Sequence, residues 1–155
     1  MTEAGKKKNP WLKRILTAFL VIVVILAGIY WYVATEKFSD TKSRDADYTL
    51  SALDLIHEFV KNDSAANKKY TEKILTVNGR ISELEAPDTS TVNVKFIDPA
   101  SGSFIIFSFQ DSHLAEGKNL KVGDSVSIKG SCSGGQYSSI LESTKIDFKR
   151  AALNK

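Results

Sequence analysis

The stretch LKVGDSVSIKGSCSGG, residues 120–135, alternates polar and apolar side chains and then carries one cysteine between serines and glycines. Val126, Ile128, Gly130 and Cys132 occupy every second position, and polar residues fill the positions between them. Because successive side chains of a strand point to opposite faces of a sheet, this spacing predicts a strand with one buried face. Cys132 shares the apolar face, so we expect its thiol to pack in the core and not to act as a nucleophile.

The same period of two recurs elsewhere in the chain. It predicts further strands at about 74–82, 92–97, 103–110 and 137–148. In the last of these, Ile140, Thr144, Ile146 and Phe148 are expected to face inward. Glu142 shares their spacing but carries a charge, so it does not suit a buried face. The Gly-rich and Pro-containing segments between the strands read as turns.

One amphipathic helix is expected at about 51–61. Ser51 is a suitable N-cap with Asp54 as its capping-box partner, and Leu55, Ile56, Phe59 and Val60 follow at helical spacing. The polar segment 62–70 fits either a helical turn or a loop. Since the strand at 103–110 is apolar on both faces, we expect the helix to cover the face that the core leaves open.

A charge-free run of 19 residues, Ile15 to Val33, precedes this domain. At 1.5 Å per residue it reaches about 28 Å, nearly the thickness of a bilayer core. A cleavable signal peptide is the alternative, but the run ends in bulky aromatics and not in small residues. We therefore expect an uncleaved anchor. The expected divisions are a basic cytoplasmic N-terminus at 1–14, the anchor at 15–34, a solvated linker at 35–47, the folded domain at 48–149 and a tail at 150–155.

The distribution of charge predicts the orientation of that anchor. Five Lys or Arg precede the apolar run, and Lys37, Lys42 and Arg44 are the cations shortly after it. The positive-inside rule then places the N-terminus in the cytoplasm and the domain outside, which in a bacterium means the inner membrane and the periplasm. From Glu36 onward 16 Lys and Arg face 17 Asp and Glu, so the overall basic pI does not indicate a nucleic-acid partner.

The segment at 120–130, together with TVNGRISEL at 76–84 and the count of strands, resembles an OB-fold, a five-stranded Greek-key barrel. The predicted fold class is therefore α+β: mainly β with one or two helices, a five-stranded barrel preceded by an amphipathic helix, and an N-terminal transmembrane helix.

Residues 48–84, together with VSIKGSCSGG and ILESTKIDF, further resemble the tRNA-anti-like family of small bacterial proteins, which are described as lipoproteins or membrane-anchored proteins. The resemblance covers about 47–148 and brings no activity and no catalytic residue. Members often carry another cysteine in the last strand, where this chain has Ser143, Thr144 and Lys145, so the resemblance implies no disulfide here.

OB-folds bind ligands on the outer face of their second and third strands and on adjoining loops. We expect a binding face there, and no catalytic residue, metal or cofactor. The hypothetical ligand-binding residues are Lys95, Ile97, Phe104, Ile106, Gln136 and Tyr137.

The sequence disfavours three other kinds of function. A single-stranded nucleic-acid or oligosaccharide site is disfavoured because Arg80 and Lys95 are the only clear cations on that face, and acidic residues occupy the neighbouring loop. A haem chaperone of cytochrome c maturation has the same layout but binds haem through a histidine after the last strand, where this chain reads KRAALNK. His57 and His113, the only histidines, are expected to be solvated or locally hydrogen-bonded. Catalysis is disfavoured because DSH at 111–113 reads as a turn and not as a triad.

The sequence therefore favours a non-enzymatic, membrane-anchored, extracytoplasmic binding or scaffolding module. The expected partner is an envelope protein, and a small ligand is the alternative.

Overall fold

The computed structural model describes residues 10–35 and 40–154, and the chain divides into two compact units, Met1–Phe38 and Ser39–Lys155. Expectations for residues 1–9, 36–39 and 155, which belong to the expected N-terminus, linker and tail, lie outside the described residues. The first unit contains α1 (Pro10–Thr35). Within it, Lys13–Tyr32 form a 20-residue stretch long and apolar enough to cross a membrane. A signal sequence would meet the same criterion, so the helix agrees with the predicted anchor by length and composition alone.

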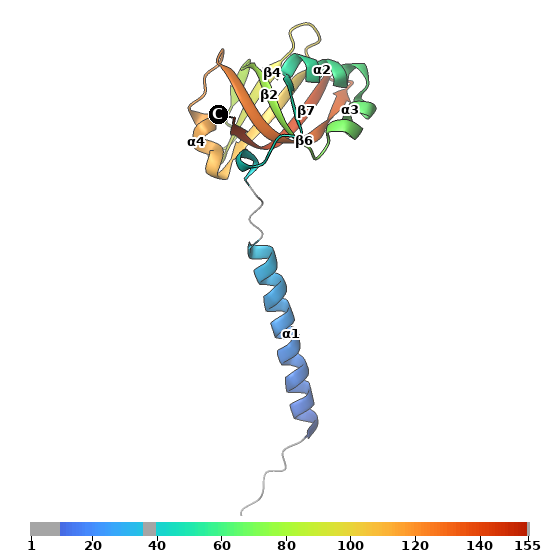
Figure 1. The fold of residues 1–155 in the computed structure, drawn as a ribbon, viewed down its shortest axis with the longest axis vertical. Helices are drawn as coiled ribbons and strands as arrows, with labels where there is room; N and C mark the ends of the chain where they lie inside the picture. Colours follow the sequence, from blue (N-terminus) through green and yellow to red (C-terminus); the bar gives the residue numbers. More distant parts are fainter. Residues whose placement is uncertain (1–9, 36–39, 155) are drawn as a thin grey trace, which may run out of the picture. The chain divides into compact units, whose positions relative to one another are not determined.

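The second unit is built on one mixed sheet of seven strands (Figure 1). Their order is β1-β2-β6-β7-β5-β4-β3, and only the pairs β1–β2 and β5–β7 are parallel. The strands are β1 (Tyr48–Ser51), β2 (Ile74–Arg80), β3 (Glu83–Glu85), β4 (Thr91–Ile97), β5 (Phe104–Gln110), β6 (Ser125–Ser138) and β7 (Ser143–Leu153). The helices of this unit are η1 (Thr41–Ser43), α2 (Ala52–Lys61), α3 (Asp63–Tyr70), η2 (Asp111–His113) and α4 (Leu114–Lys118).

The α+β class is confirmed, but the closed five-stranded barrel is not, because the paired strands form an open order of seven. β2 and β3 are consecutive in the chain, yet β2 pairs with β6 and β3 pairs with β4. Ile81 and Ser82 connect them: the Ile81 N–H donates to the Asp124 carbonyl (2.9 Å) and the Ser82 N–H to the Lys95 carbonyl (2.8 Å). These two residues lead the chain from β2, next to one edge of the sheet, to β3 at the opposite edge.

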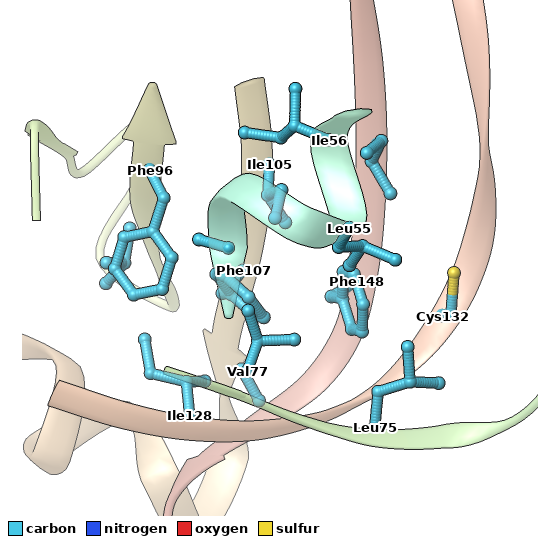
Figure 2. Packing of buried hydrophobic residues seen from close by; sticks show 14 of the residues in the cluster. Leu55, Ile56, Leu75, Val77, Phe96, Ile105, Phe107, Ile128, Cys132 and Phe148 are labelled. Carbon is cyan, nitrogen blue, oxygen red and sulfur yellow. The ribbon is translucent and has the colours of Figure 1, made fainter. Parts of the chain in front are cut away.

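The core lies on the face of the sheet that α2 covers (Figure 2). Phe96, Phe107 and Phe148 come from β4, β5 and β7, and their neighbouring ring centroids lie 5.1 and 4.7 Å apart. Leu55 and Ile56 of α2 belong to the same buried cluster. The helix begins as predicted, since Ser51 Oγ accepts the Asp54 N–H and donates to the Asp54 carboxylate.

The expectation that the helix covers the second face of β5 is wrong. Ile105 and Phe107 are buried in the cluster that α2 joins, whereas Phe104 and Ile106 are only half-buried on the opposite face. The helix has one apolar side, and packing that side on the core leaves nothing for the other face of the sheet. Val60 accordingly lies exposed on the outer side of α2.

Residues 125–135 form most of β6 and residues 120–124 precede it. Cys132 is 1% exposed and lies within the cluster of Figure 2, as its spacing predicted. A register shift between Cys132 and Gly134 accompanies the positive φ of Gly134 (106°). A Cβ on the next residue, Gly135, would lie 2.6 Å from the Phe59 ring. The two glycines therefore allow the bulge and the close approach of α2.

β6 and β7 run further than the pattern indicated. The predicted inward position of Ile140 is wrong, because this residue lies in the turn between the strands and is 92% exposed. Glu142, the charged residue on the predicted inward face, also lies in that turn and has a positive φ of 50°. The predicted tail differs too: β7 extends to Leu153, and Ala151 and Ala152 are fully buried.

Replacing Gly135 by alanine should destabilise the domain. The added Cβ would overlap the Phe59 ring, and overpacking of this kind costs about 1–3 kcal/mol. Urea unfolding of the full chain would measure the loss, with Gln136→Ala at the exposed next residue as the matched control. Equal stability of the two variants would show that the contact between Gly135 and Phe59 is not needed.

Candidate functional site

Four of the six residues expected to bind a ligand come together on one face of β4 and β5. The register places Lys95 opposite Ile106 and Ile97 opposite Phe104. All four are half-buried, and they alternate with the fully buried Val94, Phe96, Ile105 and Phe107. The period of two therefore separates a core face from a second, accessible face of the same strands.

The accessible face continues across β7 to β6. Phe104 is paired with Lys145 and Ile106 with Asp147, and Lys145 in turn pairs with Gln136. Gln136 thus lies in the same row as Phe104, two strands away. We call the surface formed by Lys95, Ile97, Phe104, Ile106, Gln136, Lys145 and Asp147 the outer β face.

Tyr137, the sixth expected residue, does not join the outer β face. It follows Gln136 along β6, pairs with the buried Thr144 and therefore belongs to the opposite parity of the strand. Because the hairpin projects beyond the core at this point, Tyr137 is still 53% exposed. The sequence placed it in the site because it could not show how far β6 extends.

Lys95 is held by two carboxylates at one margin of the outer β face. Its Nζ lies 2.6 Å from Glu85 and 3.3 Å from Glu83, and 5.7 Å from the centre of the Phe104 ring. The hydrogen bond to Glu85, supported by Glu83 and opposed by burial, raises the pKa of Lys95. With 15% of its side chain exposed, this lysine is a charge already paired within the chain.

A second ion pair lies at the other margin. The ammonium group of Lys145 is 3.0 Å from the Asp147 carboxylate, two residues along the same strand and on the same face. Sequence reasoning missed both Lys145 and Asp147, and it assigned Glu83 and Glu85 to a loop. Glu83 and Glu85 lie in β3, whose pairing with β4 places Glu83 opposite Lys95, and three residues are too few to show this pairing in the sequence.

The centre of the outer β face is apolar. Ile97, Phe104 and Ile106 form a half-buried strip between the two ion pairs, and Ile97 also borders a cavity at the start of α2. Such a surface can bury aliphatic or aromatic groups of a partner. It offers little to a phosphate chain, because both of its lysines would first have to leave their carboxylates.

The histidines lie elsewhere, each near a carboxylate. His57 is exposed on α2, and its Nε2 lies 3.6 Å from the buried Asp98. Hydrogen bonds from Ser101 and from the backbone of Ala100 lower the pKa of Asp98. Within residues 10–35 and 40–154 there is no group of three His, Cys, Asp or Glu side chains that could hold a metal ion.

His113 connects the start of the domain to its end. Of the two expected alternatives, solvation and a local hydrogen bond, it takes neither fully, because it is hydrogen-bonded but to the distant Asp40. Its ring is 12% exposed, with Nε2 at 2.7 Å from Asp40 and Nδ1 at 3.5 Å from Glu116. Glu116 also pairs with Lys42 and accepts the Leu153 N–H at 2.9 Å. Residues 40–43, predicted to be a solvated linker, are therefore docked on α4 and β7, and Thr41 is buried.

Replacing Glu116 by glutamine should loosen this docking. The variant keeps an oxygen for the Leu153 N–H but loses the charge that holds Lys42, at a cost of about 1–2 kcal/mol. Amide hydrogen exchange of residues 41–44 in the full chain should become faster at neutral pH. Glu83→Gln, at an ion pair on the far side of the sheet, is the control; equal exchange in both variants would contradict a role for Glu116.

The same docking should weaken in acid. The hydrogen bond to His113 lowers the pKa of Asp40. Burial by itself would raise the pKa of Glu116, but the hydrogen bonds from Lys42 and from the Leu153 N–H outweigh burial, so this pKa is also lowered. A carboxyl group whose pKa is lowered by docking stabilises the docked state at pH values above its ordinary pKa, which is 3.8 for Asp40 and 4.5 for Glu116. This contribution is lost as the pH falls through the lowered pKa of each group.

Cys132 is a packed side chain. Burial is the main cause that raises the pKa of its thiol to about 11 from 9.0. At pH 8 the folded chain should therefore react with iodoacetamide at least about 100-fold more slowly than the chain in urea, since only the thiolate reacts. An Ile140→Cys variant supplies an exposed thiol for comparison, and fast labelling of Cys132 in the folded chain would contradict its assignment to the core.

Comparison with known proteins places the chain in a family. The model of the tRNA_anti-like family matches residues 1–146, and the chain belongs to this family. A solved structure titled "putative nucleic acid-binding lipoprotein", from Klebsiella pneumoniae subsp. pneumoniae, is similar in fold: the TM-score is 0.53 at 18% sequence identity, over 69% of this chain and 92% of that one. No curated protein matches the chain. At this identity the likeness concerns the fold alone.

Proposed function

We propose that this chain is a membrane-anchored binding module whose outer β face binds another protein of the bacterial envelope. In this proposal α1 crosses the inner membrane with its N-terminus in the cytoplasm, and the domain works in the periplasm as a scaffold, without catalysis. The observation that carries the proposal is the accessible apolar strip of Ile97, Phe104 and Ile106 between two ion pairs.

The strip supports a protein partner because binding would remove its apolar surface from water. Removing apolar surface from water contributes about 25 cal/mol per Å², and aromatic and aliphatic side chains are enriched at the centres of protein interfaces. The paired charges of Lys95 with Glu85 and of Lys145 with Asp147 would form the polar rim. Such a rim contributes to specificity more than to affinity.

Nucleic-acid binding is the function named for the similar Klebsiella protein, and the outer β face of this chain lacks what that function requires. Binding to a phosphate backbone draws its free energy from unpaired Lys and Arg that release counterions. Here Lys95 is largely covered and held by two carboxylates, and Lys145 is paired with Asp147. Stacking on Phe104 alone would leave the phosphates facing Glu83, Glu85 and Asp147.

An OB-type barrel remains the architecture that we propose for the domain. Family membership supports it, as does the order β2-β6-β7-β5-β4 within the sheet, with the chain crossing from β2 to β3 at Ile81 and Ser82. The five lysines and arginines ahead of the apolar run support the proposed orientation.

In-cell crosslinking with the full chain tests the proposed face. A photoreactive p-benzoylphenylalanine at Ile106 should capture one reproducible envelope protein, and the same group at the exposed Val60 of α2 should not. Phe104→Ala, which removes the central ring of the strip, should lower the capture severalfold, as expected for loss of a contact of about 1–2 kcal/mol.

Three results would contradict the proposal. Capture of the same proteins at both positions would show that the outer β face is not selective. Recovery of RNA or DNA at Ile106 would favour the nucleic-acid reading. Capture that does not change in Phe104→Ala would place the interface elsewhere on the domain.

A further inference from the structure

The hairpin between β6 and β7 ends in an exposed apolar tip. Ile140 is 92% exposed and Leu141 60%, and Tyr137 lies beside them at the end of β6. The tip has a defined conformation: the Leu141 N–H donates to Ser138 Oγ at 3.3 Å, and Ser138 pairs with Ser143 across the hairpin. Scattered apolar side chains are ordinary on a protein surface, but three together on an ordered projection mark a contact surface.

The same domain contains an apolar cavity that none of its own side chains fills. It has a volume of about 350 Å³ and lies between the start of α2 and the break that follows β2. Leu53, Ile56, Ile81, Phe96, Ile97 and Pro99 form most of its apolar lining. Apolar cavities of even about 150 Å³ accept a small hydrocarbon, so this one has room for the side chain of an isoleucine together with part of a leucine.

The charges beside the tip and beside the cavity are opposite. Arg80 lines the cavity and is exposed, and its Nε donates to the Gly123 carbonyl at 2.9 Å, which holds the guanidinium in place. Glu142 follows Leu141 directly and is also exposed. An apolar pair followed by a carboxylate therefore matches an apolar cavity bordered by a guanidinium group.

We propose that the tip Ile140–Glu142 of one copy inserts into the cavity of a second copy of this chain, with Glu142 beside Arg80. The side chains around the tip and those lining the cavity are separate sets within one chain, so the contact joins two chains. Anchoring both copies in one membrane would raise their effective concentration for each other. Reciprocal insertion closes a two-fold dimer, whereas insertion in one direction only would extend into a row. Ile97 belongs both to the cavity and to the outer β face, but the residues that test this contact, Leu53 and Ile140, lie outside that face.

Disulfide formation between two differently tagged full chains in the membrane tests the contact. One chain carries Leu53→Cys and the other Ile140→Cys; native Cys132 is buried and does not compete. The mixed disulfide should form roughly tenfold more than in the control pair of Leu53→Cys with Val122→Cys, because Val122 is also exposed (62%) but lies outside the tip. Equal yields in both pairs, or no mixed disulfide, would overturn the proposal.

Charge reversal distinguishes this contact from unspecific apolar association. Arg80→Glu and Glu142→Arg, each introduced alone into both chains, should lower the yield about two- to fivefold, and the two together should restore it. No restoration would overturn the pairing of Glu142 with Arg80. A photoreactive group at Ile140 that captures a different protein, and never a second copy, would assign the tip to another partner.

Discussion

The domain depends on the packing of Phe96, Phe107 and Phe148 against one another beneath α2. These three rings come from neighbouring strands and lie in the cluster that Leu55 and Ile56 of the helix close from the other side. Because the side chains of a strand alternate, burying this row commits every second residue of β4, β5 and β7 to the opposite face. A slip of one residue in β4 or β7 would expose a phenylalanine and bury a lysine or an aspartate, so the register of these strands is strongly determined.

The outer β face is the necessary counterpart of that row. Lys95 and Ile97 flank Phe96, and Ile106 and Asp147 precede Phe107 and Phe148. Nothing in this alternation requires Ile97, Phe104 and Ile106 to be apolar, since a solvated face would accept polar residues at the same positions. The charged residues of the face are paired with one another, while its centre stays apolar. That combination distinguishes this face from an ordinary solvated surface and supports its assignment as a contact surface.

Local patterns predicted the parts of the structure that depend on local spacing. The alternation at 74–82, 92–97 and 103–110 gives β2, β4 and β5, and the capping box at Ser51 marks the start of α2. The errors concern contacts between distant residues. The sequence does not link His113 to Asp40, because that partner lies 73 residues away. Ile140 is expected to face inward because its apolar side chain alone does not show whether it will be buried. The short β1 and β3 were missed because strands of four and three residues are too short to show a period.

The pairing of charges also bears on the kind of partner that the domain can accept. A lysine held by carboxylates gives up those contacts when it contacts a phosphate, so the lost ion pairs reduce the gain from counterion release, most of all for the largely covered Lys95. Burial of Phe104 and its neighbours requires no such exchange, because Lys95 and Lys145 can keep their carboxylates at the rim. Binding through this face would then depend weakly on salt, whereas association with nucleic acid depends on it steeply. The arrangement of charges on the outer β face, more than its shape, favours an apolar protein surface as the partner.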